Sequence, residues 1–253
     1  MKKELSLIEK KELVNLQNAI YTSKNPTRKR LHNERLCLVK KFIVYVQKNK
    51  TKLKVLEIGP GSGIYLPFLK SNLAQVFASD IEKTYLQNIN IPNIKLIEDD
   101  IENTQFQENN FDIVLCSEVL EHLSSPENAI RNISKILKNG GFAIITTPQK
   151  YSLMEICCKI AFLPLVINIV RMIYCEPILK TGHISLRTQA EIKNQFSENS
   201  FKIIKQKKIG LYIPILAEIS DGKLIKKIEG KLRKNHYLDI MLWTQCYIIQ
   251  KDS

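Results

Sequence analysis

The chain has 253 residues, of which 44% are hydrophobic and 25% charged, so one large globular domain with a real core can form. This composition excludes a disordered chain, a collagen-like fibre and a small disulfide-stapled scaffold. The unusual feature is the excess of 38 Lys and Arg over 25 Asp and Glu, a net charge of +13.

The positive charge is concentrated in two flanks. Residues 1–50 carry a net charge of +9 and residues 180–253 carry +7, whereas residues 51–179 carry −3. Basic flanks suit nucleic acid, an anionic membrane surface or an anionic substrate. Solvated lysines in a composition rich in Lys, Asn and Ile explain them equally well.

Cysteine usage and apolar runs indicate the compartment. The six cysteines show no metal-ligand spacing and suit free thiols in a reducing compartment. The N-terminus has no apolar secretory segment, and the most apolar run, 160–170, contains Pro164 and is shorter than the roughly 20 residues of a membrane span. We therefore expect a cytoplasmic protein, with peripheral contact at the inner membrane surface as an open alternative.

Helical spacing predicts helices over residues 4–20 and 33–47, separated by a loop at 22–26. From residue 53, short apolar runs alternate with helical stretches. The expected strands are 53–58, 75–79, 95–98, 112–116 and 142–147, and the expected helices are 63–71, 82–89 and 126–138. Strands that are apolar on successive positions are typical of a parallel sheet covered on both faces.

The alternation is interrupted after Pro148. Residues 152–175 resemble an apolar helix or helix pair, and Thr188 to Glu191 form a capping box that opens a helix ending near Asn199. Two final strands are expected at 201–209 and 241–250. Between them, residues 222–234 predict a basic amphipathic helix with an apolar stripe of Leu224, Ile225, Ile228 and Leu232.

The strongest chemical signal is a buried strand that runs into a glycine-rich turn at Gly59, Gly61 and Gly63. Glycines let the backbone turn tightly and let a ligand lie against the main chain. The spacing differs from the dinucleotide fingerprint, because Ile64 stands where the third glycine would be. Asp80 closes the next strand, where a carboxylate can accept both ribose hydroxyls of an adenosine.

Taken with Asp99-Asp100, the segment Phe111–Leu123 and the turn at Gly140-Gly141, these residues resemble the class I S-adenosylmethionine-dependent methyltransferases, specifically the type 11 group. The resemblance runs from about Leu53 to Thr147. It implies a Rossmann-like, doubly wound α/β sheet of seven strands whose last strand is antiparallel. Residues 1–50 would form a helical N-terminal cap on a methyltransferase domain of residues 51–253, with substrate-side helical insertions after strands five and six at about 150–187 and 211–238.

The resemblance also implies a site for S-adenosyl-L-methionine. The glycines would cradle its methionine part, Asp80 its ribose, and Asp99, Asp100 and Ile101 its adenine. Ser117 and Glu118, just beyond the fourth strand, would line the methyl-transfer site. The adjacent residues Glu57, Pro60 and Ile81 complete the expected cofactor-binding set.

His122 and His183 are the candidate catalytic residues, as bases that deprotonate the acceptor. Spacing would place Glu118, Glu121 and His122 on one helical face. Quinone O-methyltransferases share that pattern and bind a divalent metal there, but the same string occurs in group members without metal, and no metal is predicted. His32 and His236 are expected at the surface. The basic residues Arg28, Lys29, Arg30 and Arg35 could fold over the cofactor, since the resemblance implies an N-terminal Arg for its carboxylate, but for most of them we expect a solvated helix face.

The acceptor is chosen by the segments outside the common core. We expect O-methylation of a small molecule, lipid or glycan; glycan is included because residues 182–185 and 242–247 resemble group members encoded beside envelope-glycan genes. The alternatives are a nucleic-acid methyltransferase and an inactive cofactor-binding partner subunit. No Asn/Asp-Pro-Pro-Tyr motif or Pro-Cys pair supports base methylation, and the flanks lack interleaved aromatic residues for stacking.

Overall fold

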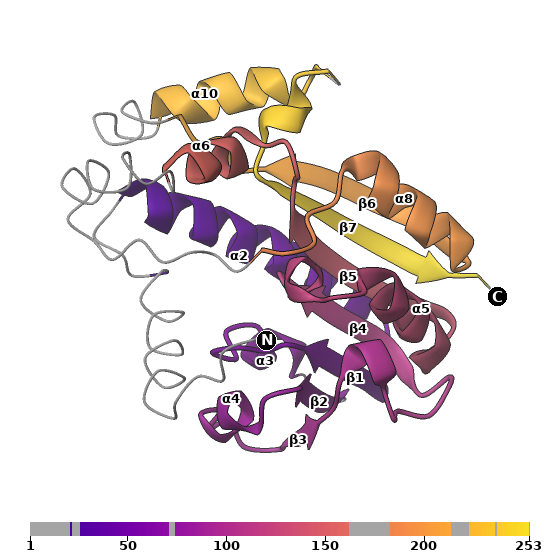
Figure 1. Cartoon of the computed structure of the whole chain (residues 1–253). Coiled ribbons are helices and arrows are strands. Elements are labelled where there is room, and N and C mark those ends of the chain that lie inside the picture. The colour runs from indigo at the N-terminus through magenta and orange to yellow at the C-terminus, as the bar shows by residue number, and fades with distance from the viewer. Residues whose placement is uncertain are drawn as a thin grey trace.

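The computed structural model describes residues 21, 26–70, 74–161, 183–213, 223–235 and 237–252. One seven-stranded sheet with the order β3-β2-β1-β4-β5-β7-β6 crosses the molecule (Figure 1). Its strands are β1 Leu53–Ile58, β2 Ala74–Asp80, β3 Ile94–Glu98, β4 Phe111–Ser117, β5 Leu137–Pro148, β6 Phe201–Ile209 and β7 Thr244–Lys251. β1 to β5 pair in parallel, whereas β7 lies antiparallel between β5 and β6. The predicted doubly wound sheet with an antiparallel last strand is confirmed.

Helices cover both faces of the sheet. The α-helices are α2 Pro26–Gln47, α3 Leu66–Leu69, α4 Lys83–Gln87, α5 Pro126–Ile136, α6 Leu153–Ala161, α8 Gln189–Glu198 and α10 Lys223–Leu232. Three short 3₁₀ turns are η1 Ile101–Asn103, η2 Leu120–His122 and η3 Asp239–Met241. No helix in these described ranges is long and apolar enough to cross a membrane.

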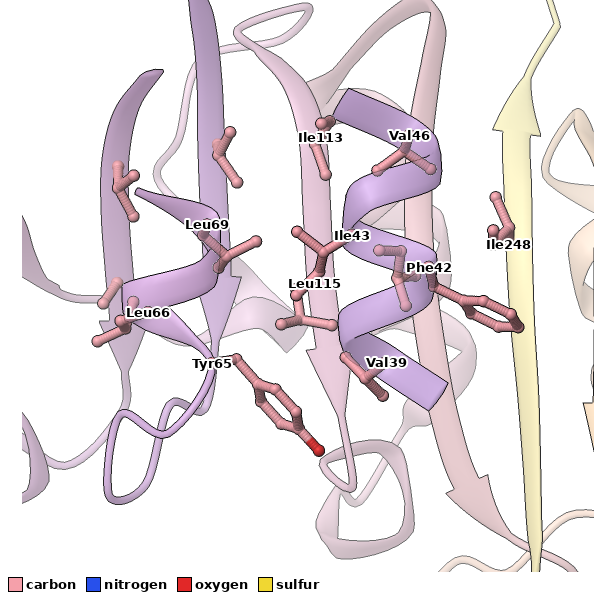
Figure 2. Packing of buried hydrophobic residues seen from close by; sticks show 14 of the residues in the cluster. Val39, Phe42, Ile43, Val46, Tyr65, Leu66, Leu69, Ile113, Leu115 and Ile248 are labelled. Carbon is pink, nitrogen blue, oxygen red and sulfur yellow. The ribbon is translucent and has the colours of Figure 1, made fainter. Parts of the chain in front are cut away.

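The core has two layers because the central strands are buried on both faces. Along β4, Ile113 and Leu115 pack into the layer under α2, α3 and α4, while Val114 and Cys116 face α5 and α8. Figure 2 shows Ile43 of α2 packed over β4 in the first layer. Helix α2, from the basic N-terminal flank, is therefore part of the domain core.

Several predicted boundaries are wrong. α2 begins at Pro26 rather than residue 33, and the helix expected at 63–71 is reduced to α3, because the glycine turn extends to residue 65. The helix expected to reach 138 ends at Ile136, where β5 begins early and pairs Leu137 with Phe111. Residues 4–20 and 162–175 lie outside the described residues.

The last helical segments gather at one end of the sheet. α6 follows the carboxyl end of β5, and Figure 1 shows α6 and α10 beside the start of α2 at this end. The apolar stripe predicted for α10 is only partly buried. Ile225 is fully buried against Leu211 and Leu242, whereas Leu224 is 49% exposed. The described parts of the two predicted insertions, α6 and α10, thus lie where the parallel strands end.

Candidate functional site

A glycine turn forms the floor of the candidate site at the carboxyl end of β1. Gly59, Gly61 and Gly63 all have positive φ angles, of 62°, 53° and 72°. A Cβ at Gly59 would lie 2.6 Å from a methyl carbon of Val119, so no side chain fits there. The buried Pro60 closes the turn, because its carbonyl accepts a hydrogen bond from the Gly63 amide at 2.8 Å. The turn presents bare main chain to a ligand, as predicted.

Two acidic side chains border this turn. Glu57 is buried, and its Oε2 has no hydrogen-bond partner among the described residues. Burial raises the pKa of Glu57 well above its usual value and raises that of Asp80 to about 6. An unsatisfied buried carboxyl and a half-buried carboxyl beside bare main chain fit a ligand with an ammonium group and a ribose. The residues present therefore fit S-adenosylmethionine.

The acids after β3 have local partners. Asp99 accepts hydrogen bonds from the Thr104 hydroxyl and the Gln105 amide, and Asp100 accepts from the Glu102 amide. These bonds cap the turn η1, so both side chains hold the loop in place. Ile101 is buried, whereas Ile81, beside Asp80, is 63% exposed and offers an apolar surface to a planar ring. Contact of Asp99, Asp100 and Ile101 with adenine, and of Ile81 with the cofactor, stays a prediction.

A buried ion pair links α2 to the end of β4. The Arg35 guanidinium donates to Glu118 Oε2 at 2.6 Å, and the Thr146 hydroxyl donates to Glu118 Oε1 at 2.9 Å. Ser117 shares a hydrogen bond with the same Thr146 hydroxyl. Glu118 has a φ of 57°, a strained angle for a residue with a side chain. Arg35 and His32 are not on a solvated face, because Arg35 is buried and the His32 ring packs against Trp243.

The expected arrangement of Glu118, Glu121 and His122 on one helical face is wrong. Glu118 precedes the short turn η2, in which Glu121 points inward and is fully buried while His122 is exposed. A 3₁₀ turn after a left-handed residue cannot align positions i, i+3 and i+4.

The structure instead brings His183 to Glu121 and His122. These three residues each place one ligand-type atom within 4.8 Å of the other two, and the two imidazole rings lie 5.3 Å apart. The peptide amides of Ile184 and Ser185 donate to the Glu121 carbonyl and hold this segment there. Such a group can hold a divalent cation or exchange protons with an acceptor, so both predicted catalytic histidines lie together.

A third element completes this group. Glu155 of α6 is 5% exposed, contacts His183 Nδ1 at 3.2 Å and accepts a hydrogen bond from Trp243 Nε1 at 3.2 Å. Glu155 and Trp243 were not predicted as site residues, and Arg35 was named only among the basic residues that could fold over the cofactor. The one signal for Glu155 was an acid in a largely apolar helix, and no local pattern marked Trp243.

A cavity of about 330 Å³ lies at the other edge of the sheet, where Leu53, Asp112 and Gly140 mark the amino ends of β1, β4 and β5. Lys50 and Lys138 also line it. In open α/β sheets, ligands bind outside the carboxyl ends of the strands. The glycine turn and the histidine pair lie at that carboxyl edge, and this cavity does not.

Comparison with known proteins agrees with this geometry. A family model described as a methyltransferase domain matches residues 29–206. A ubiquinone biosynthesis O-methyltransferase of Rickettsia akari is 29% identical over 156 residues, which are 56% of this chain and 61% of that protein. An uncharacterized protein of Methanocaldococcus jannaschii is 31% identical over 158 residues, 61% of this chain and 65% of its own. The chain thus spans less than two thirds of the length of these relatives.

Solved structures share the fold at low sequence identity. A SAM-dependent methyltransferase from Aquifex aeolicus superimposes with a TM-score of 0.56 at 12% identity, over 98% of this chain and 99% of that one. The YcgJ protein of Bacillus subtilis gives a TM-score of 0.56 at 17% identity, over 85% and 98%. These similarities support the Rossmann-like architecture.

Proposed function

The chain belongs to the methyltransferase domain family, whose model matches residues 29–206, and on that premise we propose that it is an S-adenosylmethionine-dependent methyltransferase. Its acceptor is a hydroxyl group of a small molecule, lipid or glycan. The observation that carries this proposal is that the fold brings His183 to within 5.3 Å, ring to ring, of His122, which follows the end of β4 shortly after Glu118.

Each part of the site has one role in this proposal. The glycine turn and Glu57 bind the methionine part of the cofactor, and Asp80 accepts hydrogen bonds from its ribose. When bound, the cofactor supplies an electrophilic methyl group on a sulfonium. That methyl group would pass to the acceptor oxygen, with the thioether sulfur as the leaving group that keeps the electron pair. His183 takes the acceptor proton, and the fixed strand ends hold the two reactants in line.

Exposed apolar side chains favour an acceptor with an apolar part. The segments that carry Glu155 and His183 expose large hydrophobic residues between 42% and 59%, namely Tyr151, Ile156, Ile160 and Ile184. The relatives named as ubiquinone biosynthesis O-methyltransferases support a small hydroxylated acceptor with such a part.

The test is transfer of a labelled methyl group into a total cell extract that is then separated into small-molecule, lipid, glycan and RNA fractions. We expect wild-type protein to label one of the first three fractions and Gly59→Ala to label none. Label confined to RNA would instead favour the nucleic-acid alternative. Failure of the wild type to bind S-adenosylhomocysteine in calorimetry would refute the whole proposal.

We further propose that α10 brings the enzyme to anionic membrane surfaces in the cytoplasm. Lys226, Lys227 and Lys231 are exposed along this helix, and Lys234 and Tyr237 beyond it are also exposed, Tyr237 at 87%. Since Ile225 is buried in the protein, the helix would attach by charge and by Tyr237 rather than by inserting its apolar stripe.

Flotation with liposomes containing phosphatidylglycerol tests the membrane proposal. We expect wild-type protein to float at low salt, and a variant with these four lysines changed to Gln to stay in solution. Equal flotation of both proteins would contradict the proposal.

A further inference from the structure

The catalytic proposal leaves unexplained a carboxylate that is buried beside His183. Glu155 lies in the first turn of α6, where its amide is capped by the Ser152 hydroxyl. Its side chain is 6% exposed, and among the described residues its ion-pair partner is His183 rather than a lysine or arginine. Burial of a carboxylate is unfavourable unless hydrogen-bond donors compensate for the lost water. Two donors face Glu155, and they account for its burial.

The two donors that face the Glu155 carboxylate are Trp243 and His183. Trp243 Nε1 is donor-only and lies 3.2 Å from Glu155 Oε1, which fixes the orientation of the carboxylate. His183 Nδ1 lies 3.2 Å from Oε1 and 3.3 Å from Oε2, so it faces both oxygens. A contact between an imidazole nitrogen and a carboxylate requires a proton on that nitrogen. With an ionised Glu155, which can only accept, this contact is a hydrogen bond in the tautomer of His183 that carries its proton on Nδ1.

A proton on Nδ1 decides the state of the other ring nitrogen of His183, Nε2. A neutral imidazole with its proton on Nδ1 has an unprotonated Nε2, which is the atom that can accept a proton from an acceptor hydroxyl. His122 and Glu121 border the same ring. Glu155, His183 and Trp243 come from distant parts of the chain. Glu155 lies 28 residues before His183 and 88 residues before Trp243.

We propose that Glu155, held by Trp243, is a positioning residue that fixes the tautomer and ring orientation of His183 for proton abstraction. This inference rests on the proposed function for its catalytic consequence, but the tautomer itself can be measured without an acceptor. Removal of a carboxylate that orients a functional histidine lowers activity about 10- to 100-fold in comparable sites.

The direct test is nitrogen NMR of protein labelled with ¹⁵N only in histidine. The chain has four histidines, so the His183 signals are identified by their loss in His183→Gln. We expect wild-type His183 to show a protonated Nδ1 and an unprotonated Nε2, and Glu155→Gln to show a mixture of tautomers. Glu155→Asp should keep the wild-type tautomer, and Glu198→Gln, at an exposed acid of α8, is the matched control.

The kinetic test uses the extract fraction that wild-type protein labels. Glu155→Gln should lower the rate at saturating extract about 10- to 100-fold while the affinity for S-adenosylhomocysteine stays within about twofold, and Glu155→Asp should recover part of the rate. If Glu155→Gln fails to fold, Trp243→Phe loosens the carboxylate and should give a smaller change of the same kind.

Two results would overturn the inference. One is an unchanged His183 tautomer in Glu155→Gln, and the other is an unchanged transfer rate in a folded variant. A wild-type protein that binds no S-adenosylhomocysteine would refute the proposed function alone, since the NMR measurement would still decide the role of Glu155.

Discussion

At the scale of single residues, the candidate site is marked by carboxyl groups that the fold has removed from water. Glu57, Asp80 and Glu121 all lie at or just after strand ends, and burial is the main cause that raises the pKa of each. Glu118 adds to the effect on Glu121 by charge repulsion. Proteins accumulate such unfavourable groups where a ligand compensates for them, and here a sulfonium with an ammonium group would do so.

Asp80 gives a pH-dependent prediction. Its pKa is raised to about 6 by burial, and it must be ionised to accept hydrogen bonds from both ribose hydroxyls. We expect the affinity for S-adenosylhomocysteine to fall as the pH drops through 6. Asp80→Asn should bind about 10- to 100-fold more weakly at pH 7.5 and lose this pH dependence. Calorimetry from pH 5 to 8 measures both effects.

The raised pKa of Asp80 affects stability in the opposite direction from ligand affinity. Because the folded pKa of Asp80 lies above the unfolded value, the folded state binds more protons between about pH 4 and 6, and the free protein gains stability as the pH falls through this window. Asp80→Asn should therefore be more stable than wild type at pH 7.5, by about 1 kcal/mol after solvent screening. Asp252→Asn, at an exposed acid, is the control; wild-type affinity in Asp80→Asn would contradict the assignment.

The ion pair between Arg35 and Glu118 gives a second prediction. Arg35→Met leaves the Glu118 carboxylate without its guanidinium partner and close to Glu121, so we expect a loss of about 3 kcal/mol in the free energy of unfolding. Glu118→Gln in the same chain should restore much of that loss, because it removes the unpaired charge. Denaturant unfolding of both single variants and the double variant measures the coupling; additive losses would argue against it.

At the scale of elements, α10 is held by one buried carboxylate on an otherwise basic helix. Glu229 accepts hydrogen bonds from the amides of Gly210 and Leu211 at 3.2 and 3.1 Å, and it pairs with Arg30 and Arg233. The helix is therefore attached to both the end of β6 and the start of α2. Its exposed lysines face away from this attachment, which explains how a basic surface can form on a folded domain.

Glu229→Gln should detach α10. The amide group cannot accept from all four donors and presents its own N–H groups to them, so we expect a loss of about 2–3 kcal/mol. Hydrogen exchange should accelerate in residues 223–232 while the sheet strands β1 and β4 stay protected. The control Glu198→Gln on α8 should change neither the free energy of unfolding nor the exchange rate in α10. Unchanged exchange in Glu229→Gln would show that apolar contacts alone hold α10 in place.

At the scale of the whole molecule, ligand binding and stability should be linked through the glycine turn. S-adenosylhomocysteine at about 100 times its dissociation constant should stabilise wild-type protein by about 2.7 kcal/mol. Gly59→Ala should lose this gain, because its Cβ would clash with Val119 and its φ of 62° suits glycine. Thermal unfolding with and without ligand measures the difference.

Gly140 supplies a matched control for that experiment. Its φ is 71°, but the nearest atom to a Cβ, Gln250 Nε2, lies 3.8 Å away, and the residue is at the amino edge of the sheet. Gly140→Ala should therefore lose about 1 kcal/mol by backbone strain and keep the full gain from ligand. Equal ligand gains in both variants would contradict the placement of the site.

The sequence by itself determined the sheet, the glycine turn and the capping box of α8, because these follow from local patterns: apolar strands, glycines at positive φ, and Thr188 three residues before Glu191. Helix ends were less predictable. α5 ends at Ile136 because Leu137 pairs with Phe111 in the sheet, and the local sequence does not show that pairing. The residues predicted to bind the cofactor were chosen by their position at successive strand ends and by the family resemblance, and their contact with the cofactor stays a prediction.

Only the tertiary structure decided which side chains lie together around the two histidines and Glu118. The contacts of His183 with His122 and Glu155, and that of Arg35 with Glu118, join residues that are 28 to 83 positions apart, and such contacts leave no periodic pattern in the sequence. Glu118, Glu121 and His122 show the limit most clearly. Their spacing suggested one helical face, but a left-handed residue followed by a 3₁₀ turn instead pairs Glu118 with Arg35, buries Glu121 and leaves His122 exposed.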